Sequence, residues 1–191
     1  MPRRVYLDHH AATPVDPRVR AALVQLELDH PWANPSSVHA EGRRSRQRLE
    51  TAREQIASAI QAAPADVVLT SGGTEACNLA IAGVLQAAAG LCHVVTSTIE
   101  HPAVAEPIAE LERKGAIRVT RLAVSPSAPP DPEALRAALT PDTRLCALQW
   151  VNHETGSIFP SQAYAAVCRV SGVPLFIDAT QGLGKLPLSA A

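Results

Sequence analysis

Four short polar segments of this 191-residue sequence carry side chains that could bind or transform a charged ligand. Each directly follows a short apolar run, where a strand is expected to end. In chain order they are Ser71-Gly72-Gly73-Thr74-Glu75, Ser97-Thr98-Ile99-Glu100-His101-Pro102, Asn152-His153-Glu154-Thr155-Gly156 and Asp178-Ala179-Thr180-Gln181. Ligands of open parallel sheets bind beyond the carboxyl ends of the strands. We therefore expect the four segments to meet at one site.

The first segment predicts an anion site at the start of a helix. Gly72 and Gly73 let an oxyanion approach the backbone, and the free N–H groups and the helix dipole favour negative charge there. Thr74 adds a hydroxyl donor. The segment matches neither the G-x-G-x-x-G pattern nor the P-loop. An ordinary Thr-capped helix after a tight turn is the alternative interpretation.

The other three segments offer proton-transfer and charge-pairing groups. His101 could stack on a planar ligand or move protons, or it could simply cap the next helix. Asn152-His153-Glu154 is either a polar loop or a functional cluster. Asp178 ends a nearly continuous apolar strand, where a carboxylate is costly without a partner, so it predicts a cation such as a protonated pyridine.

Together the segments predict a planar, phosphorylated, cationic heteroaromatic ligand. One sheet edge would carry an anion cradle, a stackable imidazole, polar donors and a desolvated carboxylate. Pyridoxal phosphate fits this set, with Asp178 keeping the ring nitrogen protonated so that the ring acts as an electron sink.

The elements that must position these groups alternate between short β-branched runs and longer amphipathic stretches. The pattern predicts an α/β fold, a mostly parallel sheet with helices on both faces. A first helix begins at Pro17, with Asp16 as its N-cap. The expected strands are 67–70, 93–96, 117–122, 145–151 and 174–177, and the expected helices are 39–63, 74–89, 103–114, 132–139 and 160–171.

Composition excludes several classes of protein. The formal net charge of −1, from 17 basic and 18 acidic residues, argues against a nucleic-acid-binding face. No apolar run is long enough for a transmembrane helix, and the N-terminus lacks the apolar region of a secretory signal. The four cysteines lack C-x-x-C spacing and predict reduced thiols in a cytoplasmic protein, and no metal site is expected.

The motifs above occur in the order typical of cysteine desulfurases. Two N-terminal segments belong to the same ordered set, residues 6–14 and Asn34-Pro35-Ser36-Ser37-Val38-His39. The sequence resembles this family, class V, fold-type I pyridoxal-phosphate enzymes, over essentially its whole length. The resemblance implies roles for single residues. Gly73 and Thr74 match phosphate-binding positions, and His101 matches the catalytic imidazole that stacks on the ring and assists proton transfer. Asp178 matches the partner of the pyridine nitrogen, and Gln181 matches a donor to the phenolic oxygen.

The family's second donor to that oxygen is usually an asparagine. His153 stands at this position here, with Asn152 just before it, and an imidazole N–H could replace the amide. Asn34 matches a stretch bordering the substrate. In terms of domains, the resemblance implies an N-terminal arm over 1–14 and an incomplete large domain over 15–191, without the C-terminal small domain.

One feature of the family has no counterpart here. Its Schiff-base lysine lies in a Ser-x-x-His-Lys motif beyond Asp178, and the only lysines present are Lys114 and Lys185, neither in such a motif. The mobile-loop cysteine that accepts sulfur is also without a match. We therefore expect the 191-residue chain to be inactive alone.

The activity implied for the family is conversion of L-cysteine to L-alanine, with sulfur passed through an enzyme persulfide. Its pathways are iron–sulfur cluster assembly or tRNA thiolation. Its partners would be sulfur-acceptor or scaffold proteins and a second copy in a homodimer, with no direct nucleic-acid or membrane contact. The alternatives are a non-catalytic homologue that binds cofactor or partner, a selenocysteine lyase or aminotransferase of the same class, and an unrelated α/β phosphate-binding protein.

Overall fold

A parallel four-stranded sheet lies at the centre of Thr70–Pro187, one of two compact units in the chain. The computed structural model describes residues 4–29, 33–87, 90–125 and 128–187. The second unit holds the N-terminal residues through Leu69. The division of the chain into an arm over 1–14 and a domain from residue 15 stays a prediction.

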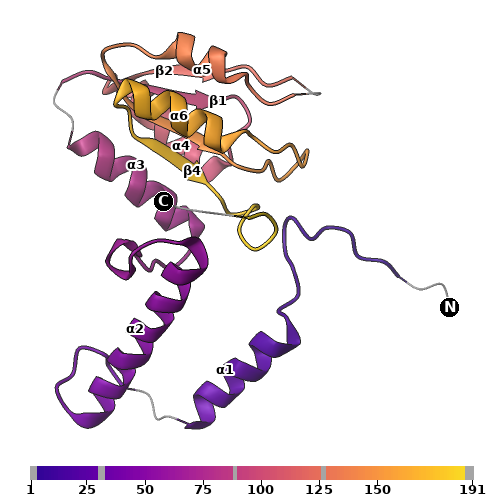
Figure 1. Ribbon diagram of the computed structural model, residues 1–191, viewed down its shortest axis with the longest axis vertical. Helices are drawn as coiled ribbons and strands as arrows, with labels where there is room; N and C mark the ends of the chain where they lie inside the picture. The colour runs from indigo at the N-terminus through magenta and orange to yellow at the C-terminus, as the bar shows by residue number, and fades with distance from the viewer. Residues whose placement is uncertain (1–3, 30–32, 88–89, 126–127, 188–191) are drawn as a thin grey trace. The chain divides into compact units, whose positions relative to one another are not determined.

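The sheet reverses its winding direction at its centre. Its strands are β1 (Cys92–Ser97), β2 (Ile117–Leu122), β3 (Thr143–Gln149) and β4 (Leu175–Asp178), in the spatial order β2-β1-β3-β4 (Figure 1). All neighbouring strands are parallel. The chain passes from β1 to one side and then returns to place β3 on the other, so the switch point lies between β1 and β3. Such a point is where open α/β sheets bind ligands.

Helices cover both faces of the sheet, as the fold-class prediction requires. The first core cluster joins the strands to α3 (Gly73–Gln86) and α4 (Pro102–Arg113). The second joins them to α5 (Pro132–Ala138) and α6 (Ser161–Ser171). Successive strand residues alternate between the clusters, Val94 entering the first and Val95 the second. In the two central strands, β1 and β3, both faces are buried, which accounts for their nearly continuous apolar sequences.

Helix starts follow the sequence signals closely. The α1 helix (Pro17–Asp29) begins as predicted, with the Asp16 carboxylate accepting the Arg18 N–H at 2.7 Å. The α5 helix has the same arrangement, an Asp131 cap followed by Pro132. Fixed proline φ and a side-chain acceptor together satisfy the first turn. None of the described helices combines the length and apolarity needed to cross a bilayer.

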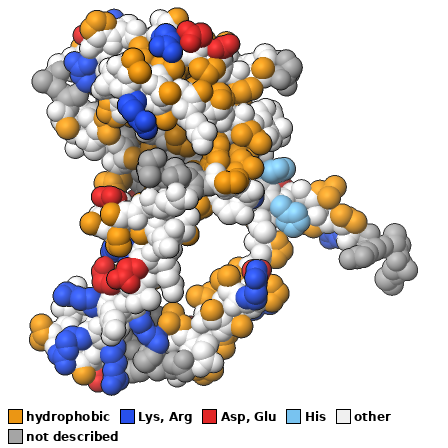
Figure 2. Space-filling view, in the orientation of Figure 1, with side chains coloured by type: hydrophobic (Ala, Val, Ile, Leu, Met, Phe, Trp, Pro, Cys, Tyr) orange, Lys and Arg blue, Asp and Glu red, His pale blue; other side chains and the backbone are white. Residues whose placement is uncertain are grey.

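The α2 helix (Ala40–Ile60) carries five arginines, and Figure 2 shows basic side chains gathered over it. Three of them donate to loop carbonyls: Arg43 to Val38, Arg46 to Pro35 and Arg53 to Val67. Gly42 is buried where a Cβ would meet the Ser37 carbonyl oxygen at 2.4 Å. The arginines and this close approach hold two segments against α2. One carries Asn34, and the other follows the short 3-10 helix η1 (Pro64–Asp66).

The expected strand at 67–70 is wrong. Residues 67–70 have no strand pairing, and Val68 is 66% exposed. Groups outside any sheet satisfy the backbone of Val67 instead. Its N–H donates to the Pro64 carbonyl, and its carbonyl accepts a hydrogen bond from the Arg53 side chain. An apolar β-branched run becomes a strand only where a neighbouring strand satisfies its backbone, and none of the described strands does so here.

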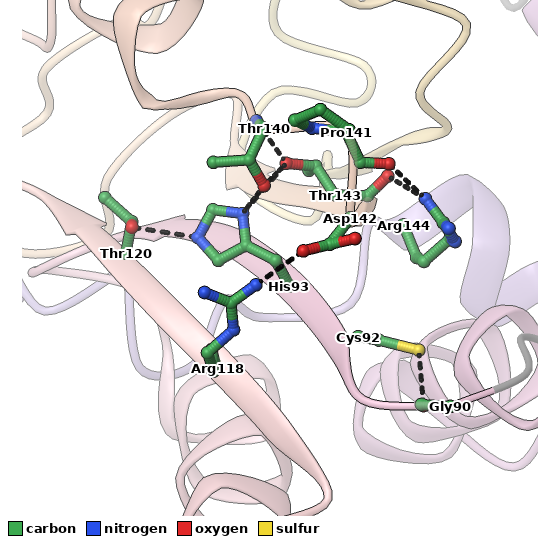
Figure 3. A network of polar contacts seen from close by, with 10 residues as sticks. All are labelled: Gly90, Cys92, His93, Arg118, Thr120, Thr140, Pro141, Asp142, Thr143 and Arg144. Atoms are coloured by element: carbon green, nitrogen blue, oxygen red, sulfur yellow. Dashed lines mark hydrogen bonds and ion pairs between the residues drawn. The ribbon is translucent and has the colours of Figure 1, made fainter.

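A buried histidine joins three strands of the sheet (Figure 3). It lies toward the amino ends of the strands, away from the carboxyl ends where ligands are expected to bind. His93 lies near the start of β1 and is 4% exposed. Its Nδ1 lies 2.8 Å from the Thr143 hydroxyl oxygen of β3, and its Nε2 lies 2.9 Å from that of Thr120 in β2. Burial lowers the pKa of His93, the Arg118 charge lowers it further, and Asp142 opposes the change. The imidazole is therefore held neutral.

The buried neutral His93 predicts acid sensitivity of folding. The unfolded chain protonates this ring near its usual pKa of about 6.5, above that of the folded chain, so stability falls as pH drops below that value. We expect chemical denaturation at pH 7.5 and 5.5 to show less loss on acidification for His93→Gln than for the unchanged protein. His9→Gln, on an exposed segment, is the control. Equal acid sensitivity of His93→Gln and the unchanged protein would contradict this.

Candidate active site at the carboxyl edge of the sheet

The start of α3 has the form of an anion cradle. Gly72 is its N-cap and no side chain caps the first turn. A Cβ at Gly72 would meet nothing within 4 Å, so the backbone is open to a ligand. Glu75 turns back to accept the Ser71 N–H and hydroxyl, both at 2.6 Å, which lowers the pKa of Glu75. Its carboxylate is therefore engaged by Ser71. The Thr-capped alternative does not apply, because Gly72 takes the cap position.

Two histidines meet across the switch point. His101 follows β1, His153 follows β3, and their ring centroids lie 5.2 Å apart in an edge-to-face arrangement. His101 caps α4, with its Nδ1 accepting the Ala103 N–H at 3.1 Å. This bond leaves Nε2 as the protonated nitrogen of the neutral ring. The capping interpretation of His101 is thus confirmed, and capping leaves Nε2 for a ligand.

A groove of about 500 Å³ joins the cradle to this histidine. It runs between α3 and α4, with Thr74 and Asn78 on one side and His101, Ala103 and Glu106 on the other. Thr74 and His101, predicted separately from two segments, therefore line one space. That is the placement needed to bind a phosphate and a ring of one molecule.

The end of β4 borders the same cradle. A Cβ at Gly73 would meet the Thr180 hydroxyl oxygen at 3.7 Å, so the start of α3 lies against the turn after Asp178. Asp178 is partly buried, and its Oδ1 accepts the Thr180 N–H at 3.0 Å. Among the described residues no basic side chain is paired with Asp178. The expected need of this carboxylate for a cationic partner therefore remains.

Gln181 sits on a turn held by close packing. A Cβ on the neighbouring Gly182 would meet the Trp150 indole at 2.3 Å, so only glycine fits against that ring. Lys185 donates from Nζ to the Gln181 Oε1 at 2.7 Å. Since the ammonium can only donate, it fixes the oxygen of the Gln181 amide toward Lys185 and the nitrogen away from it.

Asn152 holds the loop that carries His153. Its side chain is buried, and Nδ2 donates to the Ile99 carbonyl at 3.1 Å and to the Gln149 Oε1 at 3.1 Å. Its Oδ1 accepts the Thr155 N–H at 2.8 Å. These bonds give Asn152 a clear structural task, and its expected contact with a cofactor stays a prediction.

Seven of the eight predicted site residues lie in the unit Thr70–Pro187, and Asn34 belongs to the other unit. The seven are Gly73, Thr74, His101, Asn152, His153, Asp178 and Gln181. Asn34 is exposed and forms a turn with its Oδ1 accepting the Ser36 N–H at 2.8 Å. Its role beside the substrate stays a prediction. In the described part of the chain, no cluster of His, Cys, Asp and Glu could hold a metal ion.

Sequence reasoning gave no role to three residues of this edge: Thr180, Gln149 and Glu100. Gln149 donates from Nε2 to the Ile99 carbonyl at 3.0 Å, beside the bond from Asn152. Glu100 is 8% exposed although it follows a strand in a polar segment. A glutamate directly before the candidate histidine was the available signal, and burial of its carboxyl is visible only in the structure.

The chain matches a known protein family over almost its whole length. Residues 5–191 match the family model of class-V aminotransferases. The cysteine desulfurase IscS of Serratia proteamaculans is 41% identical over 191 residues, covering 96% of this chain and 46% of that protein. A cysteine desulfurase of Gluconacetobacter diazotrophicus is 39% identical over 186 residues, covering 97% of this chain and 46% of that protein.

Solved structures show the same arrangement of elements. SspA in complex with cysteine has a TM-score of 0.90 and 32% identity, covering 96% of this chain and 53% of its own. DndA from Streptomyces lividans has a TM-score of 0.82 and 39% identity, covering 96% and 51%. The chain spans about half the length of these relatives. The predicted α/β fold class is confirmed.

Packing of Gly182 against Trp150 predicts a sharp intolerance at one turn. A methyl group at this position must displace the indole or the turn that carries Gln181, so Gly182→Ala should lower the free energy of unfolding by about 1–3 kcal/mol. Gly83→Ala is the matched control, because a Cβ there meets nothing within 4 Å inside α3. The control should stabilise by about 0.5–1 kcal/mol. Chemical denaturation measures both, and equal effects would contradict the packing argument.

Proposed function

The chain belongs to the class-V aminotransferase family, and we propose that it forms the pyridoxal-phosphate-binding part of a cysteine desulfurase. One observation carries the proposal: the carboxyl edge of the sheet has an open helix N-terminus, two imidazoles in edge-to-face contact, and a carboxylate that no basic side chain in the described part of the chain pairs with. Relatives about 40% identical that carry the name cysteine desulfurase support the choice of activity.

The residues present fit the phosphate of the cofactor. The backbone at Gly73 and Thr74 and the Thr74 hydroxyl would bind it at the positive end of α3. The fit is supported by open space at Gly72, where a Cβ would meet nothing within 4 Å and would begin to fill the room for a phosphate. No side-chain cap competes for the N–H groups at the start of α3.

The residues present also fit the ring. Asp178 would pair with the protonated pyridine nitrogen, His101 would stack on the ring and move protons through Nε2, and Gln181 and His153 would donate to the phenolic oxygen. Asn152 would act through its hold on the His153 loop. When bound, pyridoxal phosphate supplies an electron sink for bonds at the substrate α-carbon.

The substrate under this proposal is L-cysteine, which Asn34 would border, and the products are L-alanine and a sulfur atom passed on as an enzyme persulfide. Sulfur-acceptor or scaffold proteins of iron–sulfur cluster assembly or tRNA thiolation would receive it. SspA, 32% identical, is known in complex with cysteine, which supports the substrate. We place the activity in the cytoplasm and in a homodimer, and the four unpaired buried cysteines accord with a reducing compartment.

The lysines and cysteines of this chain limit what it does alone. Lys114 caps the far end of α4 and pairs with Glu110 at 3.1 Å, and Lys185 is bonded to Gln181. All four cysteines are buried, and burial raises the pKa of Cys77 to about 11. A thiol that accepts sulfur must be exposed and readily ionised. The engaged lysines favour a second candidate function, reversible cofactor binding without turnover.

The charge of Asp178 predicts the affinity for cofactor. Asp178→Asn removes an ion pair with the ring nitrogen worth about 1.5–3 kcal/mol, so the 191-residue chain should bind pyridoxal phosphate about 10-fold more weakly or worse. Fluorescence titration measures the dissociation constant. Glu133→Gln, an exposed carboxylate on α5, is the control and should bind unchanged. Equal affinity of Asp178→Asn and the unchanged chain would refute the pairing.

The lysine positions predict the outcome of covalent trapping. After incubation with pyridoxal phosphate and borohydride reduction, mass spectrometry should find no stoichiometric adduct on Lys185. Purified 191-residue protein should release no alanine or sulfide from L-cysteine, while IscS of Serratia proteamaculans serves as the positive control. Steady release, or a complete adduct on Lys185, would show that this lysine replaces the one expected in the family.

A further inference from the structure

One carboxyl group at this edge has no task in the function proposed above. The Glu100 side chain is 8% exposed, and its Oε1 accepts the Ser97 hydroxyl at 2.5 Å. Its Oε2 is buried and has no hydrogen-bond partner. No described basic side chain pairs with it. An ionised carboxylate left in this way is expensive, so the site must supply either a proton or a compensating charge.

Strand pairing and one side-chain hydrogen bond place Glu100 and Asp178 on either side of Gln149. Gln149 stands opposite Asp178 in the β3–β4 ladder, and the Trp150 N–H donates to the Asp178 carbonyl at 2.9 Å. The Gln149 side chain donates to the carbonyl of Ile99, the residue before Glu100. The two carboxyl-bearing residues therefore flank Gln149, one at the end of β4 and one just beyond β1.

The described groups that interact with Glu100 electrostatically or through a hydrogen bond are neutral or acidic. They are Ser97 from β1, the Gln149 backbone from β3, Asp178 from β4, Cys77 from α3 and Tyr164 from α6. Burial raises the pKa of Glu100 to about 7, the Ser97 hydrogen bond opposes the rise, and the Asp178 charge adds to it. Asp178 thus acts on Glu100 as an uncompensated negative charge.

We propose that Glu100 is coupled to Asp178, so that binding of a cationic ligand at Asp178 makes Glu100 give up its proton. While Asp178 is unpaired, Glu100 keeps its proton as a neutral carboxylic acid. When a cationic ring pairs with Asp178, the negative field on Glu100 is compensated, its titration midpoint falls, and near neutral pH a fraction of its proton passes to solvent. The identity of the ring rests on the function proposed above, whereas the coupling of the two carboxyl groups does not.

Carboxyl titration tests the coupling without any ligand. In protein labelled with ¹³C at the glutamate carboxyl, Glu100→Gln identifies the resonance of Glu100. Asp178→Asn should move the midpoint of that resonance to lower pH by about half a pH unit or more. The exposed-site variant Glu133→Gln should leave it in place. A midpoint that Asp178→Asn leaves unchanged overturns the proposal.

Ligand binding gives a second test in the unchanged fold. The probe is 4′-deoxypyridoxine 5′-phosphate, which has the cationic ring and the phosphate but no aldehyde to react with lysines. Saturating probe should also lower the Glu100 midpoint. From pH 6 to 8 its affinity should increase more for the unchanged protein than for Glu100→Gln, since only the unchanged protein has a Glu100 proton to release on binding.

The two tests separate the two proposals. A probe that does not bind the unchanged protein defeats the proposed cofactor, and the Asp178→Asn titration alone then decides the coupling. If Asp178→Asn does not fold, the probe-induced shift decides it. A bound probe that leaves both the Glu100 midpoint and the affinity profile equal to those of Glu100→Gln overturns the inference while the cofactor proposal stands.

Discussion

The carbonyl oxygen of Ile99 is the point on which this edge of the molecule depends. It accepts two side-chain amides from the end of β3, Gln149 at 3.0 Å and Asn152 at 3.1 Å. Strand pairing aligns β1 and β3, but it stops where the strands stop. These two bonds also hold together the loops that follow β1 and β3, and the ring centroids of His101 and His153 in those loops lie 5.2 Å apart. Both amides are buried, where an unmade hydrogen bond costs far more than a made one gains. The loops are thereby fixed in register.

Much of this arrangement follows from local sequence rules. Apolar runs buried on both sides predict central parallel strands, and Asp16-Pro17 predicts the helix start that the Asp16 carboxylate completes. Parallel strands end at one edge, so polar residues after β1, β3 and β4 had to converge once the strands were identified. The cradle at Gly73 was predicted from glycine and helix-start chemistry alone. These inferences need only neighbours in sequence and the handedness of crossovers.

The remaining features depend on contacts between distant residues. The run at 67–70 has the composition of a strand, but no described strand pairs with it, and Arg53 bonds to the Val67 carbonyl instead. Burial of Glu100 depends on elements from across the unit, and the requirement for glycine at 182 depends on Trp150, 32 positions earlier in the sequence. A sequence pattern indicates which faces of an element are apolar enough to be buried. It does not indicate which distant residues pack against them, so it cannot identify a buried carboxyl group without a hydrogen-bond partner or a close approach to the backbone.

The charges at the edge narrow the ligand more than any single residue does. The start of α3 favours an anion, while Asp178, a few residues from Thr180 beside Gly73, favours a cation. A free phosphate would satisfy the helix and leave Asp178 unpaired. A simple cation would satisfy Asp178 and leave the first turn of α3 without an acceptor. One molecule that satisfies both must carry both charges, and His101, which lines the groove and contacts His153 edge to face, suits a ligand that also has a flat ring. These charges therefore support the proposed zwitterionic, planar, phosphorylated ligand, and the coupling proposed for Glu100 would make their balance sensitive to protons.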